Sequence, residues 1–368
     1  MSNRPTHGGN RVWAAQLAQC ALHELLDFSA SINPLGPPES AIAALQASLP
    51  DLCHYPDPQY TDLRQALGQH HNIDPDWILP GNGAAELLTW AAWDLAQCDR
   101  VVIPVPAFGD YFRALQLFNV TLHRASLLED TNAVGAGLKP APTLDFPDSD
   151  GTAGLLLNNP HNPTGQSWSR EAVSRWRDRY TLTLIDEAFM DFLTPSASQT
   201  VIPELGQGTT DNLVVVRSLT KFYSLPGLRL GYAVGHPDRL RRWQKRRDPW
   251  AVNSLAARVG TAIVQDQAFA QATWDWLAES RAQLYAGLQR LPGLTPLPSV
   301  ANFLLVQTQV AATRLQRELL ERDRILIRDC LSFPELGEDY FRVAVRSTAE
   351  NQRLLDALAV ILGEVQRE

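Results

Sequence analysis

The stretch Leu213-Val-Val-Val-Arg217-Ser-Leu-Thr-Lys221-Phe-Tyr-Ser-Leu-Pro-Gly-Leu-Arg229-Leu-Gly-Tyr232 joins an apolar run of strand length to a polar loop. Such a continuous apolar run is typical of a strand buried on both faces. A lysine at the mouth of a sheet can be partly desolvated, which lowers its affinity for a proton and frees the amine to attack a carbonyl. The hydroxyls of Ser218 and Thr220 and the guanidinium of Arg229 are suited to a phosphate monoester. Taken alone, the stretch would fit a surface loop equally well.

Apolar runs of strand length alternate with helical patterns on both sides of this stretch. Strands are predicted at residues 101–105, 154–158, 182–186, 213–218 and 230–234, and helices at 84–97, 111–117 and 169–180. This alternation is typical of crossover helices that cover a sheet. The sequence therefore predicts an α/β fold with a large domain built on a mostly parallel central sheet flanked by helices.

The pattern changes after about residue 250. Longer helices are predicted at 269–291, 313–322 and 348–365, with strands at 302–307 and 340–345 between them. We therefore expect three parts: an N-terminal segment, 1–45, that joins the small domain; a large domain, 46–250; and a smaller α+β domain, 251–368. Residues 131–151 are rich in Gly and Pro and lack periodicity, which predicts a surface insertion.

Composition and charge exclude several classes of protein. The 40 acidic and 32 basic residues give a net charge of -8, which would repel nucleic acids and anionic lipids. There is no apolar run long enough to span a membrane, and the N-terminus lacks an export signal, so a cytoplasmic protein is expected. The four cysteines are far apart and His70-His71 lack the spacing of a ligand pair, so we expect no metal site and place both histidines at the surface.

Polar motifs follow two more of the predicted strands. Asn158-Asn-Pro-His-Asn162-Pro-Thr-Gly165 forms a stiff, non-helical loop at the carboxyl end of one strand, where ligands collect in open α/β sheets. The next strand ends in Asp186-Glu-Ala-Phe189, an acid pair that needs a cation to meet it. Gly81-Asn-Gly83-Ala84 opens a helix whose N-terminus is suited to an anion.

A lysine, a strand-end carboxylate, an Asn and several phosphate ligands are together the requirements of pyridoxal 5'-phosphate. In these motifs and their order the chain resembles the aminotransferase-like, fold type I enzymes over essentially its whole length. The resemblance implies that Lys221 binds the cofactor as an imine, Asp186 pairs with the ring nitrogen and Asn162 contacts the ring hydroxyl oxygen. It also implies that the cofactor phosphate is bound by Gly83, Ala84, Ser218, Thr220 and Arg229.

Two branches of this superfamily compete: threonine-phosphate decarboxylases of cobalamin biosynthesis and histidinol-phosphate aminotransferases. Four segments resemble the decarboxylases: His7-Gly-Gly-Asn10, Asp27-Phe-Ser-Ala-Ser-Ile-Asn33-Pro-Leu-Gly36, Asp186-Glu-Ala-Phe189, and Ile327-Arg328-Asp-Cys with Tyr340-Phe-Arg342-Val-Ala-Val-Arg346. Most relatives have a tyrosine whose hydroxyl reaches the ring oxygen where this chain has Phe189. Loss of that donor changes the imine's proton affinity and favours decarboxylation over transamination.

The resemblance implies decarboxylation of L-threonine O-3-phosphate to (R)-1-amino-2-propanol O-2-phosphate. Arg342 would bind the carboxylate of this phosphorylated amino acid, while His7, Asn33 and Arg328 would place its phosphate. The sequence leaves open the alternative in which the two arginines exchange these anions. Phe108, with Tyr111 as the alternative, would stack on the cofactor ring. Tyr55 resembles a tyrosine that reaches the neighbouring subunit's cofactor phosphate, which implies a homodimer with shared sites. The alternatives are a histidinol-phosphate aminotransferase and a non-catalytic sensor domain that binds the same cofactor.

Overall fold

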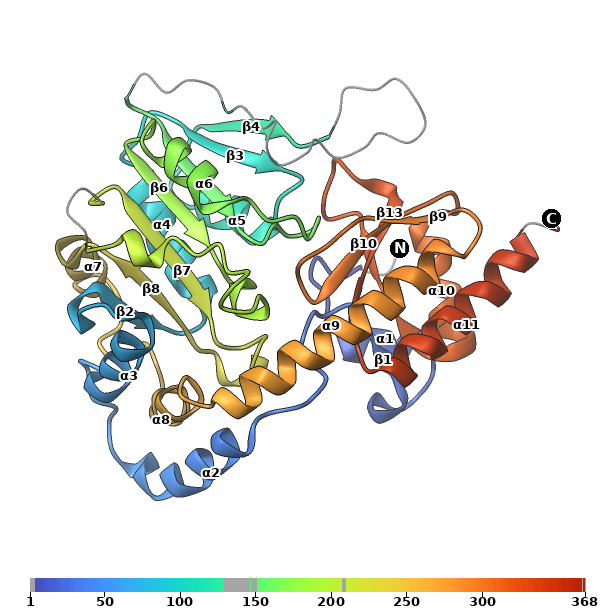
Figure 1. Ribbon diagram of the computed structural model, residues 1–368, viewed down its shortest axis with the longest axis horizontal. Helices are drawn as coiled ribbons and strands as arrows, with labels where there is room; N and C mark the ends of the chain where they lie inside the picture. The colour runs from blue at the N-terminus through green and yellow to red at the C-terminus, as the bar shows by residue number, and fades with distance from the viewer. Residues whose placement is uncertain (1–3, 129–145, 147–150, 207–209, 366, 368) are drawn as a thin grey trace. The chain divides into compact units, whose positions relative to one another are not determined.

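The computed structural model describes residues 4–128, 146, 151–206, 210–365 and 367, and these belong to two compact units (Figure 1). The larger unit contains Leu35–His161 and Ser167–Ala272, and the smaller contains Met1–Pro34, Asn162–Gln166 and Thr273–Glu368. Helix α8 (Ser254–Ile263) falls in the larger unit, whereas a boundary at residue 250 places it in the smaller one. Most of the expected insertion, 131–151, lies outside the described residues.

The larger unit is built on a seven-stranded sheet with the strand order β2-β8-β7-β6-β5-β3-β4. Its strands are β2 (Ile78–Gly81), β3 (Val101–Val105), β4 (Leu122–Ser126), β5 (Gly154–Asn158), β6 (Leu182–Asp186), β7 (Leu213–Ser218) and β8 (Gly231–Gly235). Only β8 runs against the others, since it pairs antiparallel with both β2 and β7. The predicted α/β fold with a mostly parallel sheet is therefore confirmed.

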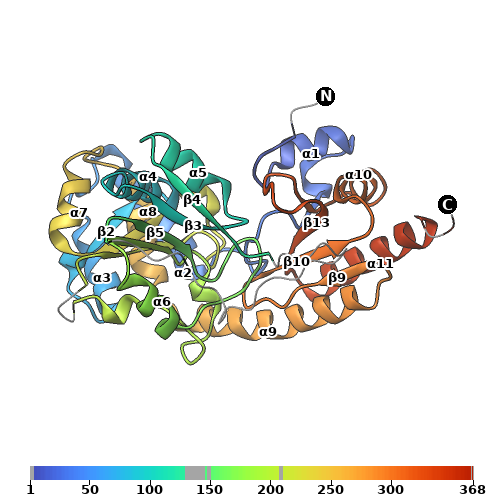
Figure 2. The same cartoon turned by 90° about the horizontal axis from the view of Figure 1, so that it is seen from above.

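Helices cover both faces of this sheet. The α-helices of this unit are α2 (Glu39–Ser48), α3 (Thr61–His71), α4 (Ala84–Leu95), α5 (Gly109–Gln116), α6 (Arg170–Arg177), α7 (Pro237–Gln244) and α8, and α2 packs against α8. Helices α5 and α6 lie on opposite faces (Figure 2), as right-handed crossovers in opposite directions along the sheet require. Leu87 and Leu95 of α4 pack with Ile103 and Val216 in one core, and β3, β5, β6 and β7 are buried along their whole length.

The smaller unit contains a four-stranded antiparallel sheet in the order β12-β13-β10-β9 and a two-stranded parallel sheet of β1 and β11. Its strands are β1 (Leu26–Asp27), β9 (Leu294–Pro296), β10 (Phe303–Thr308), β11 (Ile325–Leu326), β12 (Arg328–Cys330) and β13 (Gly337–Ala344). Its helices are α1 (Arg11–Leu17), most of α9 (Gln267–Gln289), α10 (Ala312–Asp323) and α11 (Thr348–Val365). The β1–β11 pairing ties the N-terminal segment to this unit.

His71 is half-buried and therefore less exposed than the surface position predicted for it. Its Nε2 lies 2.6 Å from the hydroxyl oxygen of Tyr232, and burial lowers the pKa of its imidazole well below the usual value. Its neighbour in the chain, His70, is exposed, because successive helical residues point in different directions.

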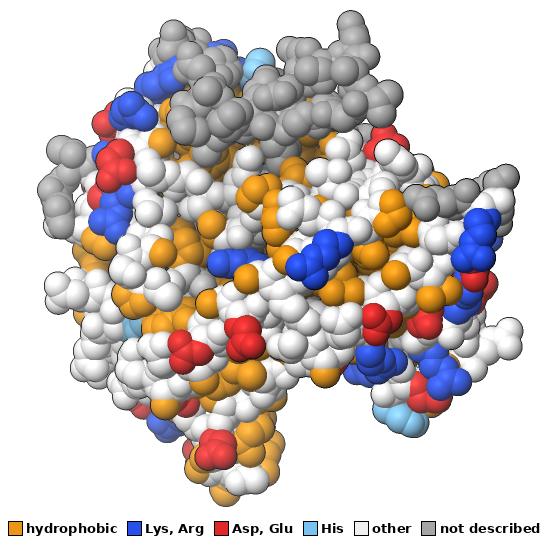
Figure 3. Space-filling view, turned by 45° about the vertical axis from the view of Figure 1, so that its right-hand side comes forward, with side chains coloured by type: hydrophobic (Ala, Val, Ile, Leu, Met, Phe, Trp, Pro, Cys, Tyr) orange, Lys and Arg blue, Asp and Glu red, His pale blue; other side chains and the backbone are white. Residues whose placement is uncertain are grey.

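Charge is distributed evenly on the visible surface. Acidic and basic side chains are interspersed on the face that Figure 3 presents, so this face carries no large field of one sign. Within the described part of the chain, no helix combines the length and apolarity needed to cross a membrane. The same residues contain no group of three or more side chains placed to hold a metal ion.

Candidate active site

The carboxyl ends of β5, β6 and β7 bring the predicted motifs of the larger unit to one edge of the sheet. Asn158 is paired in register with Asp186, and Asp186 with Val216. The Asn158 side chain donates a hydrogen bond of 2.8 Å to the backbone carbonyl of Asp186. Strand register therefore fixes where the Asp186 carboxylate emerges.

Asp186 is buried and hydrogen-bonded. Its Oδ1 accepts from the Ala188 amide at 2.8 Å, and its Oδ2 accepts from the Tyr111 hydroxyl at 2.7 Å. Burial raises the pKa of Asp186, and the charge of Lys221 and the Tyr111 hydrogen bond act in the opposite direction. A protonated ring nitrogen is a suitable further partner for this carboxylate, because a cation offsets the cost of burying it.

Lys221 lies beside the groups that the sequence places with it. Its Nζ donates to Ser218 Oγ at 3.3 Å, and the hydroxyls of Ser218 and Thr220 are 2.8 Å apart. Its ammonium also lies 5.1 Å from the centre of the Phe189 ring. Phe189 is therefore in contact with the amine that is expected to react.

The start of α4 and Arg229 form a cradle of hydrogen-bond donors. Gly83 precedes the helix with φ 76°, which glycine adopts without strain. A Cβ at Gly83 would collide with the Arg229 guanidinium, and one at Gly231 would lie 2.8 Å from the Ala84 nitrogen. A guanidinium against the N-terminus of a 12-residue helix fits a phosphate group, so the residues present fit the cofactor's phosphate as well as its ring nitrogen.

In the smaller unit, Arg328 of β12 and Arg342 of β13 are paired across the sheet, so their side chains share one face. Arg342 donates to Asn162 Oδ1 and, at 3.5 Å, to the Ser29 carbonyl. Burial, with Arg328 nearby, lowers the pKa of Arg342 to about 10. Among the described residues, no carboxylate forms an ion pair with Arg342. Two adjacent buried guanidiniums are a strong site for anions.

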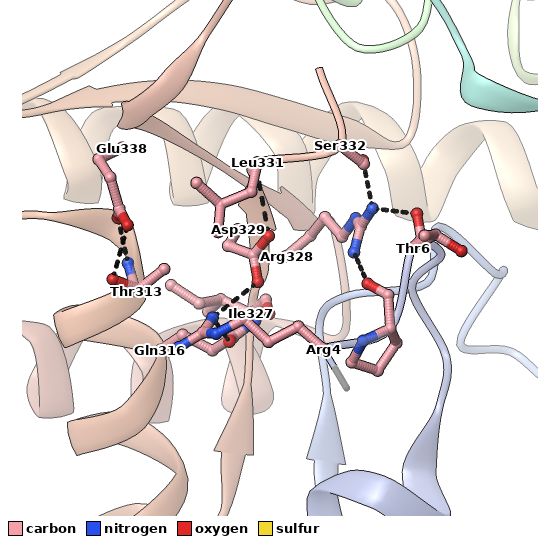
Figure 4. A network of polar contacts seen from close by, with 11 residues as sticks. Arg4, Thr6, Thr313, Gln316, Ile327, Arg328, Asp329, Leu331, Ser332 and Glu338 are labelled. Atoms are coloured by element: carbon pink, nitrogen blue, oxygen red, sulfur yellow. Dashed lines mark hydrogen bonds and ion pairs between the residues drawn. The ribbon is translucent and has the colours of Figure 1, made fainter. Parts of the chain in front are cut away.

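Arg328 also contacts the N-terminal segment. Its guanidinium donates to the carbonyls of Pro5 at 3.2 Å and Thr6 at 2.5 Å, and to Ser332 Oγ at 2.5 Å (Figure 4). His7 is therefore the next residue along a segment held by this arginine. The fourth expected substrate residue, Asn33, is buried, and its amide donates to Thr273 Oγ1 at 2.8 Å.

Of the aromatic residues expected at the cofactor, Phe108 and Tyr111 contact each other, whereas Tyr55 contacts Trp250. Phe108 and Tyr111 meet edge to face with ring centres 5.5 Å apart. Sequence reasoning gave Tyr111 only as an alternative stacking ring and missed its hydrogen bond to Asp186. Tyr55 is 79% exposed, and its ring stacks on Trp250 at 4.5 Å.

Arg217 is a second residue whose role the sequence left unassigned. Its guanidinium forms ion pairs with Glu187 at 3.1 Å and with Asp191 at 2.6 Å, and both Arg217 and Glu187 are buried. A cation was expected beside the acid pair Asp186-Glu187, and Arg217 provides it for Glu187. The sequence did contain a signal for this role. Arg217 precedes Ser218 on β7, and successive strand residues point to opposite faces, so the Arg217 side chain points away from Ser218 and Lys221.

The chain belongs to the family described as "Aminotransferase class I and II", whose model matches residues 23–358. It is 42% identical to the threonine-phosphate decarboxylase of Salmonella typhimurium, over 97% of this chain and 96% of that protein. It is 34% identical to the histidinol-phosphate aminotransferase of Symbiobacterium thermophilum, over 94% of this chain and 93% of that protein.

Two further relatives bear on the decarboxylase resemblance. The adenosylcobalamin biosynthesis bifunctional protein CobDQ of Leptospira interrogans is 32% identical over 99% of this chain and 42% of that protein. The crystal structure of L-threonine-O-3-phosphate decarboxylase from Porphyromonas gingivalis aligns with a TM-score of 0.79 and 28% identity, covering 91% of this chain and 99% of that one.

Proposed function

We propose that this chain is a pyridoxal-phosphate-dependent decarboxylase of cobalamin biosynthesis that converts L-threonine O-3-phosphate into (R)-1-amino-2-propanol O-2-phosphate and carbon dioxide. The observation that carries the proposal is the buried pair Arg328 and Arg342, because the substrate brings both a carboxylate and a phosphate. The higher identity to a threonine-phosphate decarboxylase than to the histidinol-phosphate aminotransferase supports the same reaction.

Each cofactor contact has a residue that fits it. Lys221 would bind the aldehyde carbon covalently, Asp186 would accept a hydrogen bond from the ring nitrogen, and Phe108 would stack on the ring. Asn162, whose Oδ1 accepts from Arg342, would donate from its amide nitrogen to the ring oxygen. The phosphate ligands are the Gly83 and Ala84 amides, the hydroxyls of Ser218 and Thr220, and Arg229.

Bound pyridoxal phosphate would supply an electron sink for the bonds of the substrate's α-carbon, and the orientation of the substrate would decide which of these bonds breaks. The protein chooses that bond by orienting the substrate. Arg342 would hold the carboxylate, and Arg328, His7 and Asn33 would hold the phosphate. Two anchored anions fix the torsion about the α-carbon and leave little freedom for proton loss.

We also propose a homodimer, because Tyr55 is exposed in a way that a partner would cover. Leu49 and Leu52, a few residues earlier, are more than half exposed, and Trp250 under the Tyr55 ring is 43% exposed. Contiguous exposed apolar side chains mark interaction surfaces. In the dimer, Tyr55 would reach the cofactor phosphate of the neighbouring subunit.

The test is product analysis of the purified protein loaded with cofactor. One sample receives threonine phosphate alone, and a second receives histidinol phosphate with 2-oxoglutarate. We expect aminopropanol phosphate in the first sample and no glutamate in the second, with Lys221→Ala as the inactive control. Glutamate formation without aminopropanol phosphate would make the chain an aminotransferase, and binding of cofactor with neither product would make it a sensor domain.

A further inference from the structure

The N-terminal segment is attached to the smaller unit by a contact that lies beyond the expected substrate residues. The Arg4 guanidinium donates through Nη1 to Asp329 Oδ2 at 3.1 Å and to Gln316 Oε1 at 2.9 Å (Figure 4). Gln316, on α10, in turn donates to the Ile327 carbonyl at 2.9 Å, which fixes its side chain against the chain entering β12. We refer to the contact of Arg4 with Asp329 and Gln316 as the Arg4 latch.

The Arg4 latch lies one residue from a substrate-binding arginine. Arg328 and Asp329 follow each other on β12, so their side chains point to opposite faces of the strand. Asp329 accepts a hydrogen bond from Arg4, while Arg328 donates hydrogen bonds to the carbonyls of Pro5 and Thr6. The segment is therefore held at two adjacent points of one strand, and His7 follows directly.

Burial makes this contact more than a surface ion pair. The side chains of Asp329 and Arg4 are 5% and 32% exposed, and Gln316 is buried. Such a pair is screened less by salt than an exposed pair. Removal of the Arg4 cation would leave the buried Asp329 carboxylate with fewer compensating partners among the described residues: a hydrogen bond of 3.3 Å from the Leu331 amide and the charge of the neighbouring Arg328. Loss of the cation is therefore unfavourable.

We propose that Arg4 is a positioning residue for substrate phosphate: the Arg4 latch holds residues 5–7 against Arg328, so that this guanidinium and His7 are already oriented when the phosphate binds. The inference rests on the proposed function, since it assigns the latch to the phosphate end of that substrate. Arg4 itself makes no contact with substrate. Its effect is to reduce the ordering that binding would otherwise require.

The first experiment compares Arg4→Ala with wild type in the cofactor-loaded enzyme. Loss of one charge-assisted contact predicts a KM for threonine phosphate about tenfold higher, with kcat within about threefold of wild type. The dissociation constant of L-threonine, which lacks the phosphate, should not change. The matched control is Arg324→Met, which removes an exposed ion pair between Arg324 and Glu24 that also ties the N-terminal stretch to this unit.

Two further measurements separate positioning from general destabilisation. Asp329→Asn should raise KM as Arg4→Ala does, and the double variant should be no worse than either single one, because both remove the same contact. Amide hydrogen exchange at residues 6–9, which follow Pro5, should accelerate in Arg4→Ala and stay at the wild-type rate in Arg324→Met. This second readout does not depend on the substrate's identity.

An equal loss of affinity for L-threonine, an unchanged KM, or additive effects in the double variant would each overturn the proposal. So would unchanged amide hydrogen exchange at residues 6–9. If wild type does not decarboxylate threonine phosphate, the proposed function fails by that result alone. Hydrogen exchange would still report whether the Arg4 latch holds the segment.

Discussion

Lys221 is the residue on which the cofactor assignment depends. Its Nζ contacts Ser218 and lies over Phe189, so the amine is directed into the group of motifs at the sheet edge. We predict that Lys221→Ala loses the visible absorbance of the bound cofactor and the covalent adduct that borohydride fixes in wild type. A cofactor-bearing peptide recovered from the reduced variant would show that another amine is used.

Asp186 is expected to contribute far more to stabilising the transition state than to stabilising the folded protein. A negative charge beside the ring nitrogen stabilises charge that develops in the ring, so Asp186→Asn should reduce kcat by about 10³-fold while the fold is retained. Tyr111→Phe removes one hydrogen bond to the same carboxylate and should cost roughly tenfold. Steady-state kinetics on both variants, with circular dichroism as the fold control, tests the order of these effects.

The same carboxylate gives a pH-dependent prediction for the protein without cofactor. Because burial raises the folded-state pKa of Asp186 above the unfolded value, its ionisation destabilises the fold as the pH rises above the unfolded pKa, and this loss of stability is complete above the folded-state pKa. Asp186→Asn should therefore raise the unfolding temperature of the apoprotein at neutral pH. The difference should vanish as the pH falls below the unfolded pKa of about 4. A variant less stable than wild type at neutral pH would contradict this reasoning.

At the scale of elements, the start of α4 is the most sensitive backbone position of the site. Gly83→Ala would place a methyl group on a residue with φ 76° and against the Arg229 guanidinium. We predict at least tenfold weaker cofactor binding, since a φ of 76° with a ψ of 165° is essentially restricted to glycine and costs about 1–3 kcal/mol for a residue with a side chain. Gly109→Ala is the matched control, because that glycine also begins a helix but has nothing within 4 Å of an added Cβ. Equilibrium titration of the apoproteins measures both.

Five of the seven strands of the large sheet were predictable because they are apolar and buried, whereas β2 and β4 were not predicted, and β4 contains His123 and Arg124 and is mostly exposed. The predicted bounds of β3, β5, β6 and β7 agree with the structure, while β8 is displaced by one residue because the buried Leu230 extends the apolar run. The short strands β1 and β11 could not be predicted, because two residues have no periodicity and their pairing joins positions 26 and 325. Long-range polar contacts could not be predicted either, because they join residues far apart in the sequence. Tyr111 contacts Asp186, and Arg4 contacts Asp329, only in the folded chain.

At the scale of the whole molecule, the proposed dimer assigns different roles to Leu52 and Tyr55, and substitutions can test these roles separately. Leu52→Glu places a charge on the exposed apolar surface and should shift the protein towards monomer in analytical ultracentrifugation. Tyr55→Phe keeps the stacking on Trp250 but removes the hydroxyl, so it should weaken cofactor binding and leave the dimer intact. A monomeric wild type with full activity would contradict the shared-site proposal.

The central claim is that this chain breaks the bond to the carboxylate and not the bond to the α-proton. The most direct measurement uses threonine phosphate labelled in its carboxyl carbon and counts labelled carbon dioxide against pyridoxamine phosphate formed on the enzyme. Wild type should release carbon dioxide almost exclusively, and Arg328→Ala and Phe189→Tyr should each raise the pyridoxamine fraction. Pyridoxamine phosphate as the main wild-type product, with the label retained in the substrate carbon skeleton, would contradict the account.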